Sequence, residues 1–286
     1  MSDTIDAVVD VVARTAPDVR DGLAGRRVYE SGENPTGDRQ LEADVYADEL
    51  LAERLLDLED VGGYASEERE SVLDDEGRYH VATDPLDGSS NLRSNNTMGT
   101  LFGVYDEPLP AGGDALVASG FVLYGPITTM VTARERTVTE AVIEADGSRQ
   151  VVEPALTLPD EPTVYGFGGR VPQWSEAFAV FVEAVESELK LRYGGAMIGD
   201  VNQVLTYGGI FGYPGLADRP NGKLRLLFEG HPIAHIVESA GGSSSNGERS
   251  LLECTPGSLH ERTPLFVGND GYIDRLDAAL SGKTGR

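Results

Sequence analysis

The stretch ATDPLDGSSN, residues 82–91, constrains the fold more than any other part of the chain. Asp84 closes an apolar, strand-like run, and Asp87 follows three residues later, after a proline that fixes the bend. Two carboxylates that converge at the end of a strand are hard oxygen ligands of the kind that Mg²⁺ prefers. Gly88 and Ser89 then offer backbone N–H groups, which make an anion site if the segment opens a helix or a nest. The pattern predicts phosphate chemistry beside a metal, and its alternative is a plain Asx turn.

Three further segments carry acidic residues suited to the same site. Glu67 and Glu68 follow the strand-like run GGYAS, and both can enter one site only if the strand ends there, because neighbours on a strand point to opposite faces. Asp38 ends a TGD motif, and Asp44 follows it at the mouth of a second predicted helix. Glu229 ends the predicted strand KLRLLF, just before a helix start whose positive end favours an anionic substrate.

Acids from four separated segments suit a site with two or three metal ions for phosphoryl transfer. Crowded carboxylates need such cations to remain ionised near neutral pH. One of the two adjacent glutamates can coordinate a metal while the other accepts a proton from the attacking water. The alternative is that paired glutamates in so acidic a chain lie on the surface.

The overall charge excludes several classes of partner. The chain has 48 acidic and 23 basic side chains, a net charge of −25, and only three of the basic residues are lysine: Lys190, Lys223 and Lys283. Such a chain repels nucleic acid and anionic membrane surfaces. We expect a halophilic protein, because in very high salt a Debye length of about 3 Å screens the self-repulsion. The alternative is an ordinary solvated acidic surface.

Length and composition indicate a globular chain with one large domain or two smaller ones. The single Cys254 excludes a disulfide framework. No apolar run approaches the roughly 20 residues that span a bilayer. The acidic beginning MSDTIDAVVD is not a secretory signal, so we expect a cytoplasmic protein.

The pattern of elements predicts a mixed α/β (α+β) protein of stacked layers, with mixed sheets covered by helices. Residues 115–145 indicate an antiparallel meander, because their connections are too short for crossover helices. Three prolines within residues 152–162 suggest a boundary between two subdomains. The expected helices lie near residues 5–12, 41–58, 173–189 and 231–240.

The motifs TGD-x5-D, SEE, DPLDGSSN and NGKLRLLFE-x2-P-x-A-x-I-x-E-x-AGG together resemble class I fructose-1,6-bisphosphatases over residues 30–270. The motif DP-x-DGS alone indicates only the wider group of Mg²⁺-dependent, Li⁺-sensitive phosphatases. Those relatives carry a WD-x-A-A-G type motif where this chain has FEGHPIAH. The resemblance implies a layered α-β-α-β-α sugar-phosphatase fold, with a metal-binding subdomain at 1–155 and a sugar-phosphate-binding subdomain at 156–286.

The activity that the resemblance implies is hydrolysis of the 1-phosphate of fructose 1,6-bisphosphate, in gluconeogenesis. It also implies two or three Mg²⁺ ions per subunit, with Mn²⁺ as a substitute, and a homotetramer. A sedoheptulose-1,7-bisphosphatase or a broader sugar-phosphate phosphatase is the alternative on the same site. A catalytically silent sugar-phosphate sensor would have to lack one of the metal-site acids, and none is missing.

The resemblance assigns roles to the acids. Glu68 and Asp44 match residues that help activate the attacking water, and Asp38 matches an aspartate of a mobile loop that closes over the metals. The matched metal ligands are Glu67, Asp84, the carbonyl of Leu86, Asp87 and Glu229.

The resemblance also assigns the substrate contacts. Gly88 and Ser89 match backbone donors to the 1-phosphate. An Asn and a Tyr that complete the 6-phosphate pocket in the family have no match within residues 165–174. The remaining matches are Tyr193, Tyr213 and Lys223 for the 6-phosphate, Arg192 as the arginine supplied by a neighbouring subunit, and Met197 beside the sugar.

We predict weak or absent inhibition by AMP. Arg78 and Tyr79 occupy the positions of a Lys-Tyr pair of the family's AMP site, but the N-terminal Gly-Glu-Leu-Thr motif is absent, and two residues do not make a site. Titrating AMP against phosphate release measures this. Inhibition at micromolar AMP would contradict the prediction.

Overall fold

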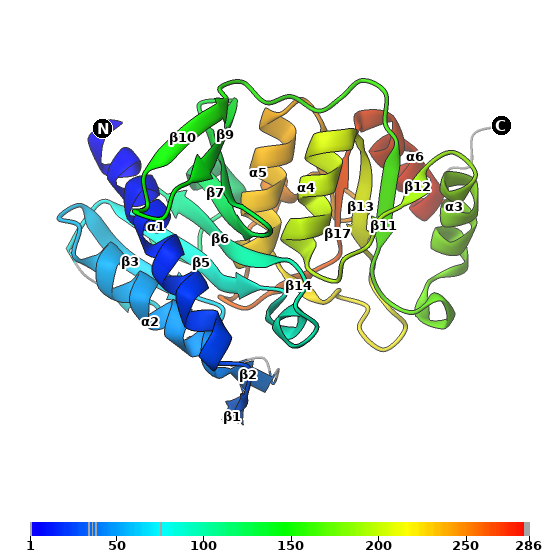
Figure 1. Cartoon of the computed structure of the whole chain (residues 1–286). Helices are drawn as coiled ribbons and strands as arrows, with labels where there is room; N and C mark the ends of the chain where they lie inside the picture. The colour runs from blue at the N-terminus through cyan, green and yellow to red at the C-terminus, as the bar shows by residue number, and fades with distance from the viewer. Residues whose placement is uncertain (1, 34, 36, 38, 75, 283–286) are drawn as a thin grey trace.

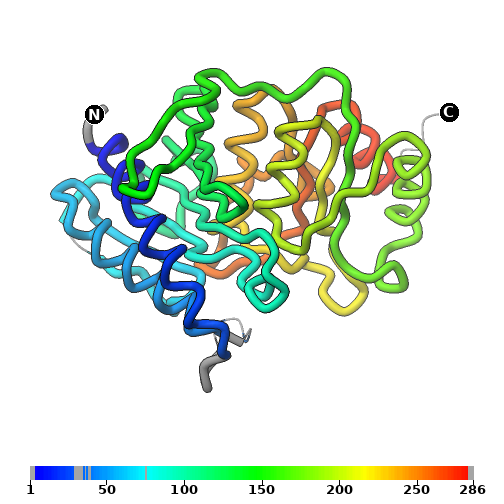
Figure 2. Tube along the Cα trace, in the orientation of Figure 1, coloured from blue at the N-terminus to red at the C-terminus, as the bar shows by residue number. Residues whose placement is uncertain are grey.

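The computed structural model describes residues 2–33, 35, 37, 39–74 and 76–282, which form five layers (Figure 1). Helices α1 (Ser2–Gly22) and α2 (Glu42–Leu56) cover one face of an eight-stranded sheet. Helices α4 (Met197–Tyr207) and α5 (His231–Ser239) lie between that sheet and a five-stranded one. The outer face of the second sheet is covered by α3 (Glu176–Glu186) and α6 (Asp270–Leu280). The predicted α-β-α-β-α layering is therefore confirmed. Figure 2 shows α1 and α2 at one end of the molecule and α3 and α6 at the other.

The eight-stranded sheet has the order β10-β9-β8-β7-β6-β5-β3-β4. Of these described strands, only β3 and β5 are parallel neighbours. The antiparallel meander predicted for residues 115–145 is present as β7, β8 and β9. The bounds along the chain are β3 (Val61–Ser66), β4 (Leu73–Asp74), β5 (Tyr79–Asp87), β6 (Met98–Tyr105), β7 (Leu116–Tyr124), β8 (Thr128–Arg134), β9 (Thr137–Ile143) and β10 (Arg149–Glu153).

The five-stranded sheet has the order β12-β11-β13-β17-β15, in which β11 runs parallel to β12 and β13. Two short ladders lie outside both large sheets, one between β1 and β2 and one between β14 and β16. The bounds are β1 (Tyr29–Glu33), β2 (Arg39–Leu41), β11 (Val164–Phe167), β12 (Lys190–Leu191), β13 (Gly209–Tyr213), β14 (Leu224–Arg225), β15 (Ser243–Ser245), β16 (Arg262–Thr263) and β17 (Leu265–Gly268).

Apolar side chains fill the spaces between successive layers. One cluster lies under α1 and α2, and a second surrounds α4 and α5 between the two sheets. A third, aromatic cluster joins the five-stranded sheet to α3 and α6. Phe178 and Phe181 belong to this third cluster, and Trp174 packs against it. No helix among the described residues is long and apolar enough to cross a bilayer.

The segment KLRLLF departs from the expected strand. Only Leu224–Arg225 is extended, and Leu226–Gly230 forms a π-helical turn that runs directly into α5. The ladder stops because the partner strand β16 is two residues long. The Tyr105 hydroxyl then donates to the Leu227 carbonyl at 3.1 Å and satisfies a backbone group within the turn. Glu229 consequently lies in a helical turn rather than at the end of a strand.

We expect Phe178→Ala to destabilise the protein by about 3–5 kcal/mol, because it leaves a cavity in the third cluster. Phe178 is 1% exposed, and its ring packs edge-on against Phe167 at 5.2 Å between centroids. Urea unfolding in concentrated KCl measures the change. Val180→Ala, on the same helix but 62% exposed, is the control and should shift stability by no more than about 0.5 kcal/mol. Similar stabilities for the two variants would contradict this packing.

Candidate active site

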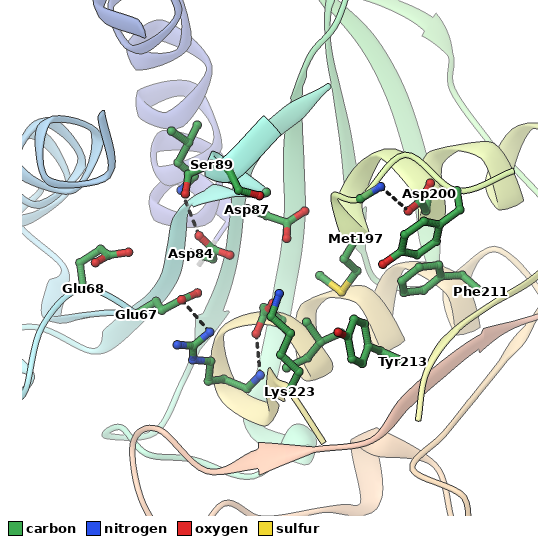
Figure 3. Close-up of a pocket in the computed structure, with 18 residues that line it drawn as sticks. Glu67, Glu68, Asp84, Asp87, Ser89, Met197, Asp200, Phe211, Tyr213 and Lys223 are labelled. Carbon is green, nitrogen blue, oxygen red and sulfur yellow. Dashed lines mark hydrogen bonds and ion pairs between the residues drawn. The ribbon is translucent and has the colours of Figure 1, made fainter. Parts of the chain in front are cut away.

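A cleft of about 230 Å³ opens where the ends of β3 and β5 meet the start of α4 and the π-helical turn. Figure 3 shows Glu67, Glu68 and Asp84 on one side of it and Met197, Asp200, Phe211 and Tyr213 on the other, with Lys223 between them. Most residues singled out from the sequence line this cleft: Glu67, Glu68, Asp84, Leu86, Asp87, Gly88, Ser89, Tyr193, Met197, Tyr213, Lys223 and Glu229.

Both adjacent glutamates enter the cleft because β3 ends at Ser66. The backbone then leaves the sheet: the Glu67 N–H donates to the Thr83 carbonyl at 3.1 Å, and the Glu68 N–H donates to the Ser66 hydroxyl at 3.1 Å. The alternation that sends strand neighbours to opposite faces no longer applies beyond this point. The condition under which both carboxylates share one site is therefore met, and they do not lie on an open surface.

The DPLD segment presents its two carboxylates through an irregularity in β5. The register between β5 and β6 shifts between Asp84 and Asp87. The Leu86 N–H donates to Asp84 Oδ1 at 3.0 Å, while the Thr100 hydroxyl donates to the Pro85 carbonyl at 2.9 Å. The peptide between Pro85 and Leu86 is thus held on both sides. The bond from the Leu86 N–H to Asp84 is an Asx turn, so the turn stated as the alternative is present, and it lies at the cleft with both carboxylates.

Asp87 and Gly88 join this loop to α4. Asp87 Oδ2 accepts the Ile198 N–H at 2.7 Å, in the first turn of α4. Gly88 has φ +74°, and a Cβ there would lie 2.2 Å from the Cβ of Ala196. Any side chain at position 88 would push the two halves of the molecule apart. Ser89 opens the short 3₁₀ helix Ser89–Arg93, so the loop enters a helical turn, as the anion-cradle prediction requires.

Arg225 links two of the acids and is a site residue that sequence reasoning missed. Its Nη1 lies 2.7 Å from Glu67 Oε1, and its side chain is 4% exposed. Its backbone N–H donates to Glu229 Oε2 at 2.5 Å. An available signal was its position two residues after Lys223, because residues two apart in an extended segment point to the same side.

Three acids come close enough to share one ion. Glu67, Asp84 and Glu229 each offer a carboxylate oxygen, and these oxygens lie within 4.8 Å of one another. Burial, followed by the negative charge of Glu67, raises the pKa of Glu229 to about 8 and raises that of Asp84 well above its usual range. A divalent cation supplies the charge that keeps such carboxylates ionised, and an all-oxygen donor set fits a hard ion.

Glu68 and Asp44 form a second group of acids beside this cluster. Burial, followed by the charges of Glu67 and Asp44, raises the pKa of Glu68 to about 8. Burial also raises the pKa of Asp44 to about 7, although the Leu41 N–H donates to its Oδ2 at 2.7 Å. Gln40 Nε2 donates to Glu68 Oε2 at 2.5 Å. Carboxylates with pKa values near neutrality are suited to take up a proton. The predicted Asp38 lies outside the described residues.

The opposite wall of the cleft combines phenols with a cation. Lys223 Nζ lies 5.6 Å from the ring centre of Tyr213, and the Lys223 charge partly offsets the burial that raises the pKa of Asp87 to about 7. Tyr193 is 46% exposed, whereas Met197 is buried. An ammonium group and phenol hydroxyls that line one cleft can bind a phosphate together.

Arg192 does not line this cleft within one chain. It borders a neighbouring cavity of about 300 Å³, and its Cζ lies 5.9 Å from the ring centre of Tyr207. Asp200 borders both cavities and was not predicted. Its carboxylate accepts the Gly194 N–H at 2.6 Å and the Gly195 N–H at 3.3 Å, which fixes the turn between Tyr193 and α4. Only the closeness of Asp200 in sequence to the glycine turn could have indicated this role in fixing the turn.

The five-layer fold and the acidic cleft together place this protein in the class of layered sugar phosphatases. Residues 16–153 match the family model described as the N-terminal domain of fructose-1-6-bisphosphatase, and residues 158–281 match the C-terminal domain. The chain therefore belongs to the fructose-1,6-bisphosphatase family.

Individual relatives agree with this assignment. The fructose-1,6-bisphosphatase class 1 of Natronomonas pharaonis is 76% identical over 282 residues, which cover 98% of this chain and 100% of the relative. That of Halobacterium salinarum is 59% identical over 287 residues, covering 99% and 100%. The crystal structure of Leishmania major fructose-1,6-bisphosphatase in holo form superposes with a TM-score of 0.88 at 31% identity, covering 97% of this chain and 92% of that one.

We predict that stabilisation by Mg²⁺ grows as the pH rises. Glu229 and Glu68 have folded-state pKa values of about 8, above their ordinary value, so the metal-free folded state binds more protons than the unfolded state at intermediate pH. Ionisation of these two groups should therefore lower the stability of the metal-free protein increasingly as the pH rises from the ordinary carboxylate pKa to about 8.

Protons compete with metal for the same oxygens, so Mg²⁺ should raise the melting temperature more at about pH 9 than at about pH 6. Differential scanning fluorimetry with and without MgCl₂, at matched ionic strength in KCl, measures both trends. An equal Mg²⁺ effect at the two pH values would contradict the prediction.

Proposed function

We propose that this protein hydrolyses the 1-phosphate of fructose 1,6-bisphosphate, releasing fructose 6-phosphate and phosphate, and that it acts in gluconeogenesis. The observation that carries the proposal is the convergence of Glu67, Asp84 and Glu229 to within 4.8 Å, across one cleft from Lys223 and Tyr213. A cleft with acids at one end and a cation at the other suits a substrate with two phosphates. Membership of the family supports this substrate.

The proposed cofactor is Mg²⁺, two or three ions per subunit, with Mn²⁺ as a substitute. Its ligands would be Glu67, Asp84, Asp87, Glu229 and the carbonyl of Leu86. When bound, the metal polarises the phosphoryl group and offsets negative charge that develops in phosphoryl transfer. The chain contributes a preorganised shell, because Asp84, Asp87 and Glu229 are each oriented by a backbone N–H.

Glu68 and Asp44 would accept the proton of the attacking water. Both lie beside the acid cluster, and burial raises the pKa of each to near neutrality, so each can hold a proton at working pH. Gln40 donates to Glu68 and leaves the other carboxylate oxygen for the water. Asp38 is proposed to close over the metals from its loop.

The remaining residues would hold the substrate. Backbone N–H groups of Gly88 and Ser89 bind the 1-phosphate beside the acids. The proposed contacts at the far end are Tyr193, Tyr213 and Lys223 to the 6-phosphate, Met197 to the sugar, and Arg192 from a neighbouring subunit.

We also propose a division into subdomains, an oligomeric state and a location in the cell. Residues 1–155 would form a metal-binding subdomain and residues 156–286 a sugar-phosphate-binding subdomain. Because Arg192 lies outside the cleft of its own chain, its proposed role requires at least a dimer, and we propose a homotetramer. The protein would be cytoplasmic and halophilic, and its partners would be small molecules rather than nucleic acid or membranes.

A second candidate is a sedoheptulose-1,7-bisphosphatase or a broader sugar-phosphate phosphatase. The observation that favours it lies beside Tyr213. The Gly168 backbone packs closely against the Tyr213 ring, since a Cβ there would lie 2.2 Å from it, and residues 165–174 offer no match for the Asn and the Tyr that complete the 6-phosphate pocket in the family. With fewer contacts to the second phosphate, the site would discriminate less between sugars.

Phosphate release from a panel of sugar bisphosphates and monophosphates, with Mg²⁺, tests the assignment. The primary proposal requires fructose 1,6-bisphosphate to have the highest kcat/KM. Preference for sedoheptulose 1,7-bisphosphate would replace it with the second candidate. Absence of phosphate release from every substrate would contradict both.

We expect Asp84→Asn and Glu229→Gln each to reduce kcat/KM at least 10³-fold while the fold is retained, because each removes a charged metal ligand from a shared cluster. Phosphate release and far-ultraviolet circular dichroism provide the measurements. Asp106→Asn is the control, since Asp106 lies at an exposed ion pair with Arg78. Turnover near that of the wild type in either cluster variant would rule out the proposed site.

A further inference from the structure

The turn of residues 66–69 carries both adjacent glutamates beyond the end of β3. It is closed by the Arg69 N–H, which donates to the Ser66 carbonyl at 3.1 Å. The Ser66 hydroxyl accepts the Glu68 N–H within the same turn. These bonds shape the turn locally, but they do not determine where the turn lies relative to the other acids of the site. That placement needs contacts to other elements.

The side chain of Arg69 makes one such contact, to α2. Arg69 Nη2 lies 2.7 Å from Asp48 Oδ2, and the Asp48 side chain is only 5% exposed. The Tyr64 hydroxyl donates to the other oxygen, Asp48 Oδ1, at 3.0 Å, and the Thr83 hydroxyl donates to Tyr64 at 2.8 Å. Both oxygens of this carboxylate are therefore engaged, one by the turn and one by the sheet.

Asp48 lies one helical turn after Asp44, so the two aspartates share a face of α2. Asp44 is close enough to Glu68 for its charge to raise the pKa of that group. The helix that places Asp44 at the site is thus the same helix that holds Arg69. The ion pair spans the gap between the two segments that supply the proposed proton acceptors.

The backbone of Arg69 contacts the second half of the chain. His260 Nε2 lies 2.8 Å from the Arg69 carbonyl oxygen, and the His260 ring packs 5.3 Å from that of Phe228, next to Glu229. One residue of the turn is therefore held by α2 through its side chain and by the second subdomain through its carbonyl.

We propose that Arg69 and Asp48 are positioning residues that fix the turn carrying Glu67 and Glu68 relative to Asp44. The inference rests on the proposed function only in that these acids serve a metal site. A buried ion pair is weak evidence of added stability, because desolvation offsets its attraction. Its directional contact to the turn suits a role in orienting the proposed metal ligands instead. Mutation of residues that orient metal ligands typically weakens metal binding 10–100-fold.

The test uses Mn²⁺ binding followed by electron paramagnetic resonance, without substrate. Arg69→Gln should weaken Mn²⁺ binding about tenfold, because the turn loses its anchor. Amide hydrogen exchange in the peptide spanning residues 66–69 should quicken in the metal-free protein. Arg69→Lys keeps a charge for Asp48 and should recover most of the affinity. Arg78→Gln, which breaks the exposed pair with Asp106 at 3.9 Å, is the matched control and should leave both readouts unchanged.

Asp48→Asn tests the same contact from α2 if Arg69→Gln does not fold. The double variant should bind Mn²⁺ no more weakly than the worse single variant, because both substitutions break one interaction. A folded Arg69→Gln with wild-type Mn²⁺ affinity and exchange rates would overturn the proposal, as would fully additive losses in the double variant. Phosphate release is assayed separately, so a failed substrate assignment would leave these readouts intact.

Discussion

The acids of this cleft repel one another, and most local features around it hold them together despite that repulsion. Two unit negative charges about 5 Å apart repel by about 3 kcal/mol at an effective dielectric constant of about 20. Glu67, Asp84 and Glu229 are at about this separation and are largely removed from water. Backbone N–H groups and the Arg225 guanidinium offset part of this repulsion, and bound cations would offset the rest.

The same constraint explains why the site is shared between the two halves of the chain. Each half supplies acids on elements that end at the cleft, so no single strand has to carry all of them. The first half contributes the parallel pair β3 and β5, whose carboxyl ends lie at the same edge of the sheet. The second contributes α4, whose first turn donates to Asp87, and the π-helical turn with Glu229. Contact between Gly88 and Ala196 brings the halves close enough for this arrangement.

The parts of the site that could be predicted from the sequence are those encoded in short motifs. DPLDGSSN and SEE specify their own turns, and their neighbouring apolar runs show where the strands end. The π-helical turn could not be predicted, because it depends on how short β16 is and on Tyr105, far away in the sequence. Arg225 and the contact between Arg69 and Asp48 were missed for the same reason. Each acts through a partner that only the folded chain brings near.

Repulsion among the chain's 48 acidic side chains is therefore reduced in two different ways, one at the surface and one in the cleft. Mobile salt screens charges on the exposed surface, where a Debye length of a few ångströms at about 1 M salt suppresses repulsion between neighbours. Buried carboxylates are screened far less, so added salt relieves the surface without relieving the cleft. The acids of the cleft depend instead on nearby positive groups, such as Arg225 at 2.7 Å from Glu67 and Lys223, whose charge acts on Asp87, and the proposed cation would add to them. An acid-rich surface and an acid-rich site thus arise from the same residue types but are stabilised by different means.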